Sequence, residues 1–344
     1  MSKKAPPQDP RSPDPRSPDN KPEKVSLRSE QLRAFVSTTR GQLRQLLSTA
    51  RRRRPDFLEL MRFNRPIGTL LLLWPTLWAL WFAANGMPHL DVLGIFVLGV
   101  ITMRAAGCVI NDYADRNIDG NVERTQQRPL VDGRIQPKEA LYLFAGLCLL
   151  AFVLVLFTNR LTVLLAFGGL ALASIYPFAK RHTHLPQVVL GAAWAWAIPM
   201  AFAAQTGTVP GEAWALYCGV VLWTIAFDTY YAMVDRADDI KIGVKSTAIL
   251  FGEDDLMIIG VLQGLTLLAL LIAGSEFSRG IWYYGGLVFV TCLFYYQFRI
   301  AHHREPAACL RAFLNNNWVG ASLFIAILLD YHLPFTSLLP TVAP

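Results

Sequence analysis

The sequence is poor in charged residues and in cysteine, and both shortages narrow the class of protein. Only 17% of its 344 residues are Asp, Glu, Lys or Arg, whereas 53% are hydrophobic and the mean hydropathy is +0.34. This composition excludes an ordinary soluble domain. The five cysteines lie singly, without the spacing of a metal site or disulfide framework, and we interpret them as small buried hydrophobic residues. They are Cys108, Cys148, Cys218, Cys292 and Cys309.

The first 54 residues lack the apolar content of the rest of the chain. They are rich in Pro, Ser, Arg, Lys and Asp, so residues 1–25 are expected to be disordered. Residues 27–53 suit either an amphipathic basic helix on an anionic membrane surface or a solvated linker. No apolar region follows the basic residues, which argues against a signal peptide, and the acidic residues argue against a mitochondrial presequence. We therefore predict an extension over 1–54 and a membrane domain over 55–344.

After the extension, the apolar residues form nine blocks. Each is roughly 18–22 residues long, enough for a helix to cross a bilayer core of ~30 Å. The sequence thus predicts an all-α polytopic membrane protein with nine transmembrane helices. The blocks lie near 66–86, 91–112, 138–157, 161–178, 185–204, 213–232, 256–273, 280–299 and 316–335.

Basic residues are distributed unevenly between the loops. One set of alternate loops is rich in Arg and Lys, whereas the opposite loops hold only Arg160 and Arg279. The positive-inside rule then predicts that the basic loops and the N-terminus are cytoplasmic. This rule and the run Arg51–Arg54 account for the net charge of +7. Because the rest of the chain lies in lipid, nucleic-acid binding is not expected.

Two acidic clusters follow the second and sixth apolar blocks. At helical pitch Asn111, Asp115 and Asp119 fall at i, i+4 and i+8, and Asp235 and Asp239 repeat the i, i+4 spacing. Carboxylates at membrane depth are costly and are commonly functional. Hard oxygen ligands suit Mg²⁺, which also binds substrate phosphates. The clusters therefore predict a diphosphate held between two metal-binding helices on the cytoplasmic side.

Two charged residues lie deeper than these clusters. Arg104 precedes Asn111 by seven residues, or two helical turns, and either neutralises a neighbouring acid, caps a buried carbonyl or binds a substrate carboxylate. Asp228 lies two turns before Asp235, and the sequence assigns it no role.

Further polar residues lie beside the clusters. Arg124 and Arg128 either contact a diphosphate or only obey the positive-inside rule, which also explains Arg134. Tyr176 and Lys180 either reach a phosphate or belong to the interfacial belt of a helix end. His182 and His184 have no further metal ligand beside them, and the run Asn315–Asn317 is interpreted as a cap or turn before the last helix.

At these residues the chain resembles the UbiA superfamily of intramembrane prenyltransferases, and within it the 4-hydroxybenzoate polyprenyltransferases. The resemblance covers about residues 55–338. It rests on four segments, which are Met103–Cys108 with Asn111–Arg116, Arg124–Thr125 with Arg128–Leu130, Tyr231–Arg236 with Asp239, and Lys245–Gly252.

The resemblance implies nine transmembrane helices around a central cavity and Mg²⁺ as cofactor. The metal would be bound by Asn111, Asp112, Asp115, Asp119, Asp235 and Asp239, although Asp112 points off the shared helical face. Of these, Asp115, Asp119, Asp235 and Asp239 would be catalytic. The implied substrate-binding residues are Arg104, for the carboxylate of the aromatic acid, and Asn111, Arg124, Arg128, Tyr176, Lys180, Tyr231 and Lys245.

The implied reaction transfers a polyprenyl group from polyprenyl diphosphate to the ring carbon ortho to the hydroxyl of 4-hydroxybenzoate, a step of ubiquinone biosynthesis in the bacterial inner membrane. One alternative is a different acceptor, such as homogentisate, a naphthoate or haem. Another is a cation-coupled transporter. The position of both clusters at one face, rather than at the membrane midplane, argues against a transporter.

Overall fold

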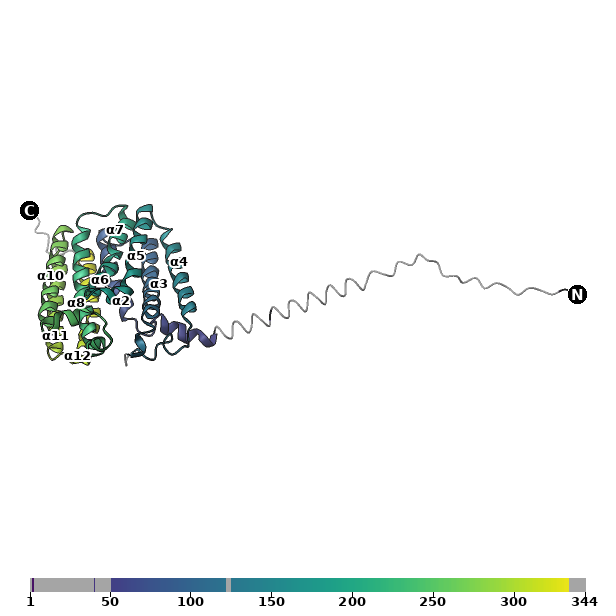
Figure 1. Cartoon of the computed structure of the whole chain (residues 1–344). Coiled ribbons are helices and arrows are strands. Elements are labelled where there is room, and N and C mark those ends of the chain that lie inside the picture. Colours follow the sequence, from purple (N-terminus) through teal and green to yellow (C-terminus); the bar gives the residue numbers. More distant parts are fainter. Residues whose placement is uncertain (1, 3–39, 41–50, 122–124, 334–344) are drawn as a thin grey trace, which may run out of the picture. The chain divides into compact units, whose positions relative to one another are not determined.

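In this computed structural model the apolar blocks of the sequence fold into long α-helices (Figure 1). The structure describes residues 2, 40, 51–121 and 125–333, and no strand occurs among them. The predicted extension over 1–54, with its possible amphipathic segment 27–53, lies almost entirely outside these residues. Arg124 also lies outside them. Everything described below belongs to residues 56–333, which form one compact unit.

The helices follow one another with short connections. Several begin with proline in the first turn, where its missing N–H has no partner to lose. In chain order they are α2 (Ile67–Ala84), α3 (Leu90–Asp115), η1 (Asp119–Asn121), α4 (Pro137–Val155), α5 (Arg160–His182), α6 (Pro186–Ala195), α7 (Ala197–Thr206), α8 (Ala213–Ile242), α9 (Thr247–Phe251), η2 (Gly252–Asp254), α10 (Asp255–Glu276), α11 (Ile281–Ala301) and α12 (Pro306–His332).

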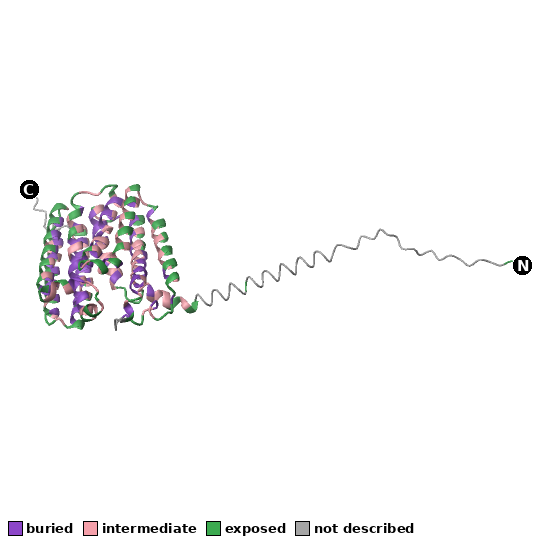
Figure 2. Ribbon diagram, in the orientation of Figure 1, coloured by how far each residue is buried: buried purple, intermediate pink, exposed green. Residues whose placement is uncertain are grey.

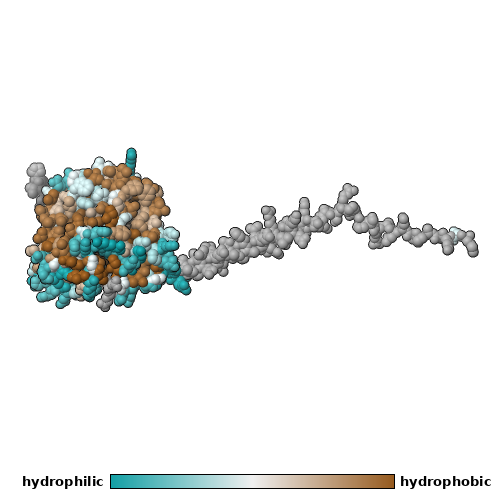
Figure 3. Space-filling view, in the orientation of Figure 1, coloured by the Kyte–Doolittle hydropathy of each residue, from teal (hydrophilic) through white to brown (hydrophobic). Residues whose placement is uncertain are grey.

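The described residues contain eight spans that are long and apolar enough to cross a membrane, with α6 and α7 forming one span. The 21-residue helix α11 is not among these eight spans, but it packs against both α10 and α12 and is long enough to be a ninth. The predicted all-α membrane bundle is therefore confirmed, and its helices are consistent with the predicted count of nine. Figure 3 shows apolar residues over most of the visible side of the bundle and polar residues mainly toward its lower edge.

The start of the last helix was predicted wrongly. Its apolar block was placed at 316–335, but α12 begins at Pro306. The three asparagines are therefore inside the helix, not in a cap or turn. Asn316 Oδ1 accepts a hydrogen bond from Trp223 Nε1 at 2.8 Å, and Asn317 Oδ1 accepts one from Trp74 Nε1 at 3.0 Å. These amides are tolerated within the bundle because indole groups of neighbouring helices satisfy them.

The core lies where α2, α8 and α12 meet. Trp78 of α2 stacks on Trp223 of α8 with ring centroids 5.4 Å apart, and both side chains are buried. In contrast, α4 and α5 lie at the periphery and bury few of their residues (Figure 2). The inner helices thus form a rigid frame, and the peripheral pair covers one side of it.

The ends of α3, α5 and α8 meet at one end of the bundle. Arg181 near the end of α5 donates a hydrogen bond to the carbonyl of Ala114 in the last turn of α3. The Lys245 N–H just after α8 donates to the Lys180 carbonyl at 3.2 Å. These contacts bring both acidic clusters and the Tyr176–Lys180 segment to the same place.

Candidate active site

A cavity of about 1170 Å³ lies within the bundle, between α2, α3, α5, α6 and α8. Charged and polar side chains line its end near the C-terminal ends of α3, α5 and α8, and mainly apolar side chains line the remainder. Its volume lies above the range of ~300–1,000 Å³ that is usual for small-molecule sites. The cavity therefore suits a ligand with a polar head and a long apolar body.

The first acidic cluster reaches the cavity from two elements rather than from one helix. Asn111 and Asp115 lie one turn apart on α3 and line the cavity. The predicted i+8 position of Asp119 on that helix is wrong, because α3 ends at Asp115 and Asp119 begins η1. Asn117 and Gly120 are poor helix formers and favour this turn. Asp119 still lines the cavity, and its carbonyl accepts a hydrogen bond from Thr125 Oγ1 at 2.7 Å.

Asp112 is bound by two arginines. Its carboxylate accepts hydrogen bonds from Arg62 Nη2 at 2.9 and 3.2 Å and pairs with Arg128 Nη1 at 3.0 Å. Burial tends to lower the pKa of Arg62, but the charge and hydrogen bond of Asp112, together with smaller effects of Cys108 and Tyr231, raise that pKa above its ordinary value. Arg128 also pairs with Asp119. Asp112 therefore holds the side chains of Arg62 and Arg128 at the polar end of the cavity.

The second acidic cluster lies on α8, as its spacing predicts. Asp235 and Asp239 are one turn apart and both line the cavity. Asp238 does not line it and pairs instead with Lys241 at 3.1 Å. Arg236 binds the carbonyls of Ala248 and Gly252, as well as Asp255, and so ties α8 to the segment that follows it.

Lys180 of α5 bonds to Oδ2 of Asp115, and Tyr176 lines the cavity one turn deeper on the same helix. The other Asp115 oxygen, Oδ1, is buried and has no hydrogen-bond partner among the described residues. A buried carboxylate oxygen without a partner is costly, and a cation brought by a ligand would satisfy it.

Burial raises the pKa of the Asp119 carboxyl to about 6, although the nearby Arg128 opposes the shift. Asp115 and Asp112 add to it, because like charges disfavour further ionisation. Burial and the neighbouring carboxylates together make Asp119 easier to protonate than a solvent-exposed aspartate.

Of the remaining predicted basic residues, Lys245 lines the cavity and Arg124 is not among the described residues. Arg134 does not line it. Its guanidinium pairs with Asp56, Glu59 and Asp132, and hydrogen bonds to these acids raise its pKa. Arg134 therefore links the loop before α4 to residues ahead of α2.

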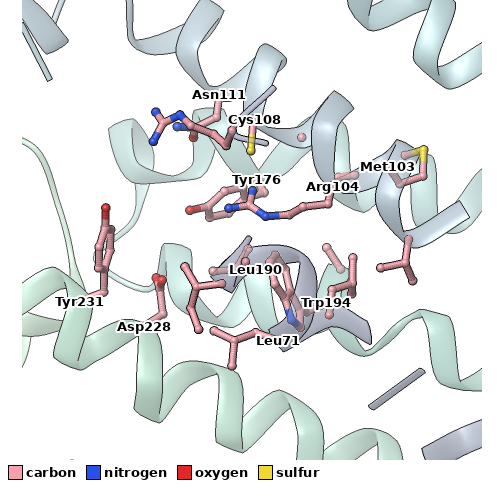
Figure 4. A pocket seen from close by; sticks show the side chains of 18 of the residues that line it. Leu71, Met103, Arg104, Cys108, Asn111, Tyr176, Leu190, Trp194, Asp228 and Tyr231 are labelled. Carbon is pink, nitrogen blue, oxygen red and sulfur yellow. The ribbon is translucent and has the colours of Figure 1, made fainter. Parts of the chain in front are cut away.

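Arg104 and Asp228 lie farther into the cavity, as Figure 4 shows with Tyr176, Trp194 and Tyr231 around them. The Arg104 guanidinium lies over the Trp194 ring, 5.5 Å from its centroid, and attracts Asp228 electrostatically. A Cβ at Gly68 would lie 2.3 Å from Arg104 Nε, so glycine leaves the room that the guanidinium needs.

Several cavity-lining residues were missed or left without a role in the sequence analysis. Among them are Arg62, Gln187, Trp194 and Asp228. Gln187 was detectable as an amide within an apolar block, and Asp228 as an acid at membrane depth. Nothing in the sequence distinguished Arg62 from other basic residues near it.

On the apolar side, the cavity extends between the peripheral helices. Phe152 and Val155 of α4 and Phe167 and Leu170 of α5 line it. Phe152, Phe167 and Leu170 are also exposed on the outside of the bundle. The cavity wall on this side is therefore thin and faces the lipid.

No group of three His, Cys, Asp or Glu side chains within 51–121 and 125–333 is arranged to hold a metal ion on its own. This includes His182 and His184. Any ion bound at the acidic clusters would have to complete its coordination with ligand atoms.

The fold and cavity define a polytopic membrane protein with an internal cavity that has a charged end and a long apolar body. The model of the UbiA prenyltransferase family matches residues 72–328, and the chain belongs to this family.

Among its relatives is a 4-hydroxybenzoate octaprenyltransferase from Ectopseudomonas mendocina, 61% identical over 278 residues that cover 81% of this chain and 94% of the relative. A solved apo structure of a UbiA homologue from Aeropyrum pernix K1 has a TM-score of 0.69 at 24% identity, covering 76% of this chain and 97% of that one. A homologue from Archaeoglobus fulgidus, solved with GPP and Mg²⁺, has a TM-score of 0.62 at 19% identity, with coverages of 79% and 99%.

Proposed function

We propose that this protein transfers a polyprenyl group from polyprenyl diphosphate to the ring carbon ortho to the hydroxyl of 4-hydroxybenzoate, a step of ubiquinone biosynthesis. One observation carries the proposal. The same cavity has acidic residues of α3 and α8 at its polar end and Arg104 two helical turns deeper. This order suits a diphosphate head beside an aromatic acid. The name of the 61% identical relative supports the same reaction.

The residues at the polar end fit Mg²⁺. Their donors are carboxylate and amide oxygens, the buried Asp115 Oδ1 has no partner among the described residues, and Mg²⁺ commonly takes one or two carboxylates together with substrate phosphates. When bound, the ion neutralises charge on the diphosphate as it leaves. We assign its binding to Asn111, Asp115, Asp119, Asp235 and Asp239. Asp112 is assigned instead to positioning Arg62 and Arg128, because both arginines already occupy its oxygens.

Basic side chains at the same end would bind the diphosphate. Lys180 and Arg128 each pair with a site carboxylate and lie where phosphate oxygens would compete for them. Tyr176 and Lys245 add a hydroxyl and a further ammonium to the cavity wall. Preorganised charges of this kind stabilise the leaving group without reorganisation during the reaction.

Arg104 would bind the carboxylate of 4-hydroxybenzoate. Its planar fork can donate two parallel hydrogen bonds to a carboxylate, and Trp194 holds the guanidinium through a cation–π contact. The ring would then lie between Arg104 and the diphosphate, close to the allylic carbon of the donor.

In the reaction, the allylic C–O bond of the donor breaks and the electron-rich carbon ortho to the phenol attacks the allylic cation. The ring then loses a proton and regains aromaticity. The cavity wall must exclude water, which would otherwise quench the cation. Aromatic faces such as those of Trp194 and Tyr231, which line the cavity, stabilise positive charge near them.

The apolar side of the cavity accounts for the rest of the donor. Its thin wall at α4 and α5 would let a long polyprenyl tail pass into the lipid. The charge distribution between the loops favours an inner-membrane protein with the acidic end at the cytoplasm.

We further propose that residues 55–344 carry the activity. Removing residues 1–50 should then leave the transfer rate intact.

The proposed function is tested by a transfer assay. Membranes that contain the protein receive labelled polyprenyl diphosphate, Mg²⁺ and one of several acceptors, namely 4-hydroxybenzoate, homogentisate or a naphthoate. We expect prenylated 4-hydroxybenzoate with Mg²⁺ and none after chelation. Preferential labelling of another acceptor would overturn the assigned substrate, and no transfer to any acceptor would overturn the reaction.

A further inference from the structure

Asp228 is a cavity-lining carboxylate that the mechanism above leaves unused. It lies on α8 seven residues before Asp235, so it is about 10 Å farther along the helix axis from the polar end. Arg104 has the same spacing from Asn111 on α3. Each of the two helices thus carries its outer pair of oxygen donors one turn apart and a charged residue two turns deeper.

The surroundings of Asp228 keep its carboxylate available within the cavity. Gln187 lies near enough to influence it, and the Asp228 side chain forms no salt bridge among residues 51–121 and 125–333. The positive charge of Arg104 acts on the Asp228 carboxylate, and the charge of Asp228 in turn acts on the Tyr176 hydroxyl. Figure 4 shows Asp228 projecting toward the space that Arg104, Tyr176 and Tyr231 also border.

We infer that Asp228 is the base that removes the ring proton after the new carbon–carbon bond has formed. This inference rests on the proposed function. When the ring carbon bonds to the allylic carbon, that ring carbon carries both the prenyl group and its original hydrogen. The Asp228 carboxylate takes this hydrogen as a proton, and the electron pair of the broken C–H bond restores the aromatic ring. The step needs no further reactant.

Position distinguishes Asp228 from the other groups that line the cavity. The carboxylates of Asp112, Asp115 and Asp119 lie at the polar end and are paired with Arg62, Arg128 or Lys180. No histidine is among the described residues that line the cavity. A ring whose carboxylate is bound by Arg104 lies next to Asp228, which is therefore the carboxylate closest to the depth at which the proton is released.

The inference is tested with 4-hydroxybenzoate deuterated at both positions ortho to the hydroxyl. In the natural protein we expect C–O cleavage to limit the rate, and therefore nearly equal rates with labelled and unlabelled acceptor. In Asp228→Asn, kcat should fall by about 100-fold or more, as expected for loss of a general base. Deprotonation should then limit the rate, so a primary deuterium isotope effect should appear on kcat.

Two further variants make the outcome decisive. Asp228→Glu keeps a carboxylate and should retain more activity than Asp228→Asn, with a smaller isotope effect. Asp238→Asn removes an acid of the same helix that lies outside the cavity, and it should match the natural protein.

An Asp228→Asn variant without an isotope effect, but with a raised KM for the acceptor, would overturn the inference and leave Asp228 as a partner that positions Arg104. Activity of Asp228→Glu no higher than that of Asp228→Asn would also overturn it. Failure of the proposed function is seen separately, because the natural protein would then not prenylate 4-hydroxybenzoate at all.

Discussion

Lys180 and Asp115 join α5 to α3 through a single carboxylate oxygen, and the second Asp115 oxygen stays buried without a partner among the described residues. At the polar end of the cavity, one oxygen of Asp115 thus has a hydrogen-bond partner and the other has none among the described residues. A cation on the unsatisfied side and a phosphate beside Lys180 would complete both groups at once. The relationship explains why a carboxylate and an ammonium are both kept inside the bundle.

Removal of the site carboxylates should abolish prenyl transfer. We expect Asp115→Ala and Asp235→Ala to have no measurable activity, and Lys180→Met to lose about 100-fold in kcat, the scale for one lost charge-stabilising donor. Rates are measured with labelled donor at saturating acceptor. Lys241→Met, which changes an exposed partner of Asp238, serves as the matched control and should keep full activity. Activity that survives both alanine substitutions would exclude the proposed site.

Changes at Arg104 should affect the acceptor selectively. A charged hydrogen bond is worth about 1.5–3 kcal/mol, so Arg104→Ala should raise KM for 4-hydroxybenzoate by roughly 10- to 100-fold. Arg104→Lys keeps the charge but loses the planar fork, so its KM for 4-hydroxybenzoate should lie between those of the natural protein and Arg104→Ala. KM for polyprenyl diphosphate, measured in the same series, should change little. An unchanged acceptor KM would contradict the carboxylate-binding role of Arg104.

The role of Asp112 can be separated from metal binding. If it positions Arg62 and Arg128, Asp112→Asn should raise KM for the polyprenyl diphosphate by about tenfold while the Mg²⁺ concentration for half-maximal rate stays constant. Asp115→Asn should instead raise the Mg²⁺ requirement. A Mg²⁺ titration of both variants decides the point, and a large shift for Asp112→Asn would return Asp112 to the metal ligands.

The Mg²⁺ requirement should depend on pH near 6. Burial raises the pKa of Asp119 to about 6, so this carboxyl becomes protonated as the pH falls through that value. Metal ligands must be deprotonated, and the apparent Mg²⁺ affinity should therefore decrease below pH 6 and level off above it. Mg²⁺ titrations of the transfer rate between pH 5 and 8 measure this, with Asp119→Asn as the comparison. A requirement that is constant across the range would count against Asp119 as a ligand.

The hydrogen bond between Trp223 and Asn316 should contribute to stability rather than to catalysis. Asn316→Leu keeps the side-chain volume similar but leaves the buried Trp223 N–H without its acceptor, at a cost of about 1–3 kcal/mol. Thermal unfolding of the detergent-solubilised protein should shift to lower temperature. A second substitution, Trp223→Phe, should cost less in the Asn316→Leu background than alone. Equal costs in both backgrounds would mean that the two residues are not coupled.

Much of the helix content was predictable, because the length of an apolar block and its flanking prolines are local properties. Asp235 and Asp239 on one face of α8 are a clear case, since only helical pitch is involved. The same reasoning failed for Asp119, because α3 ends at Asp115 and Asp119 lies in the following 3-10 turn, from which it still lines the cavity. It also failed at the start of α12, where three consecutive asparagines, of which Asn316 is buried, lowered the hydropathy of a true helix.

The sequence by itself determined which segments cross the membrane, at which end the acids gather, and that a cation lies deeper on the same helix as the first acidic cluster. Pitch and hydrophobicity suffice for these properties, because each depends on neighbours along the chain. Only the tertiary structure decided that Lys180 pairs with Asp115, that two arginines occupy Asp112, and that Asp228 lies beside Arg104. Those relationships join helices that are far apart in sequence, and the packing of whole helices against one another sets which side chains meet.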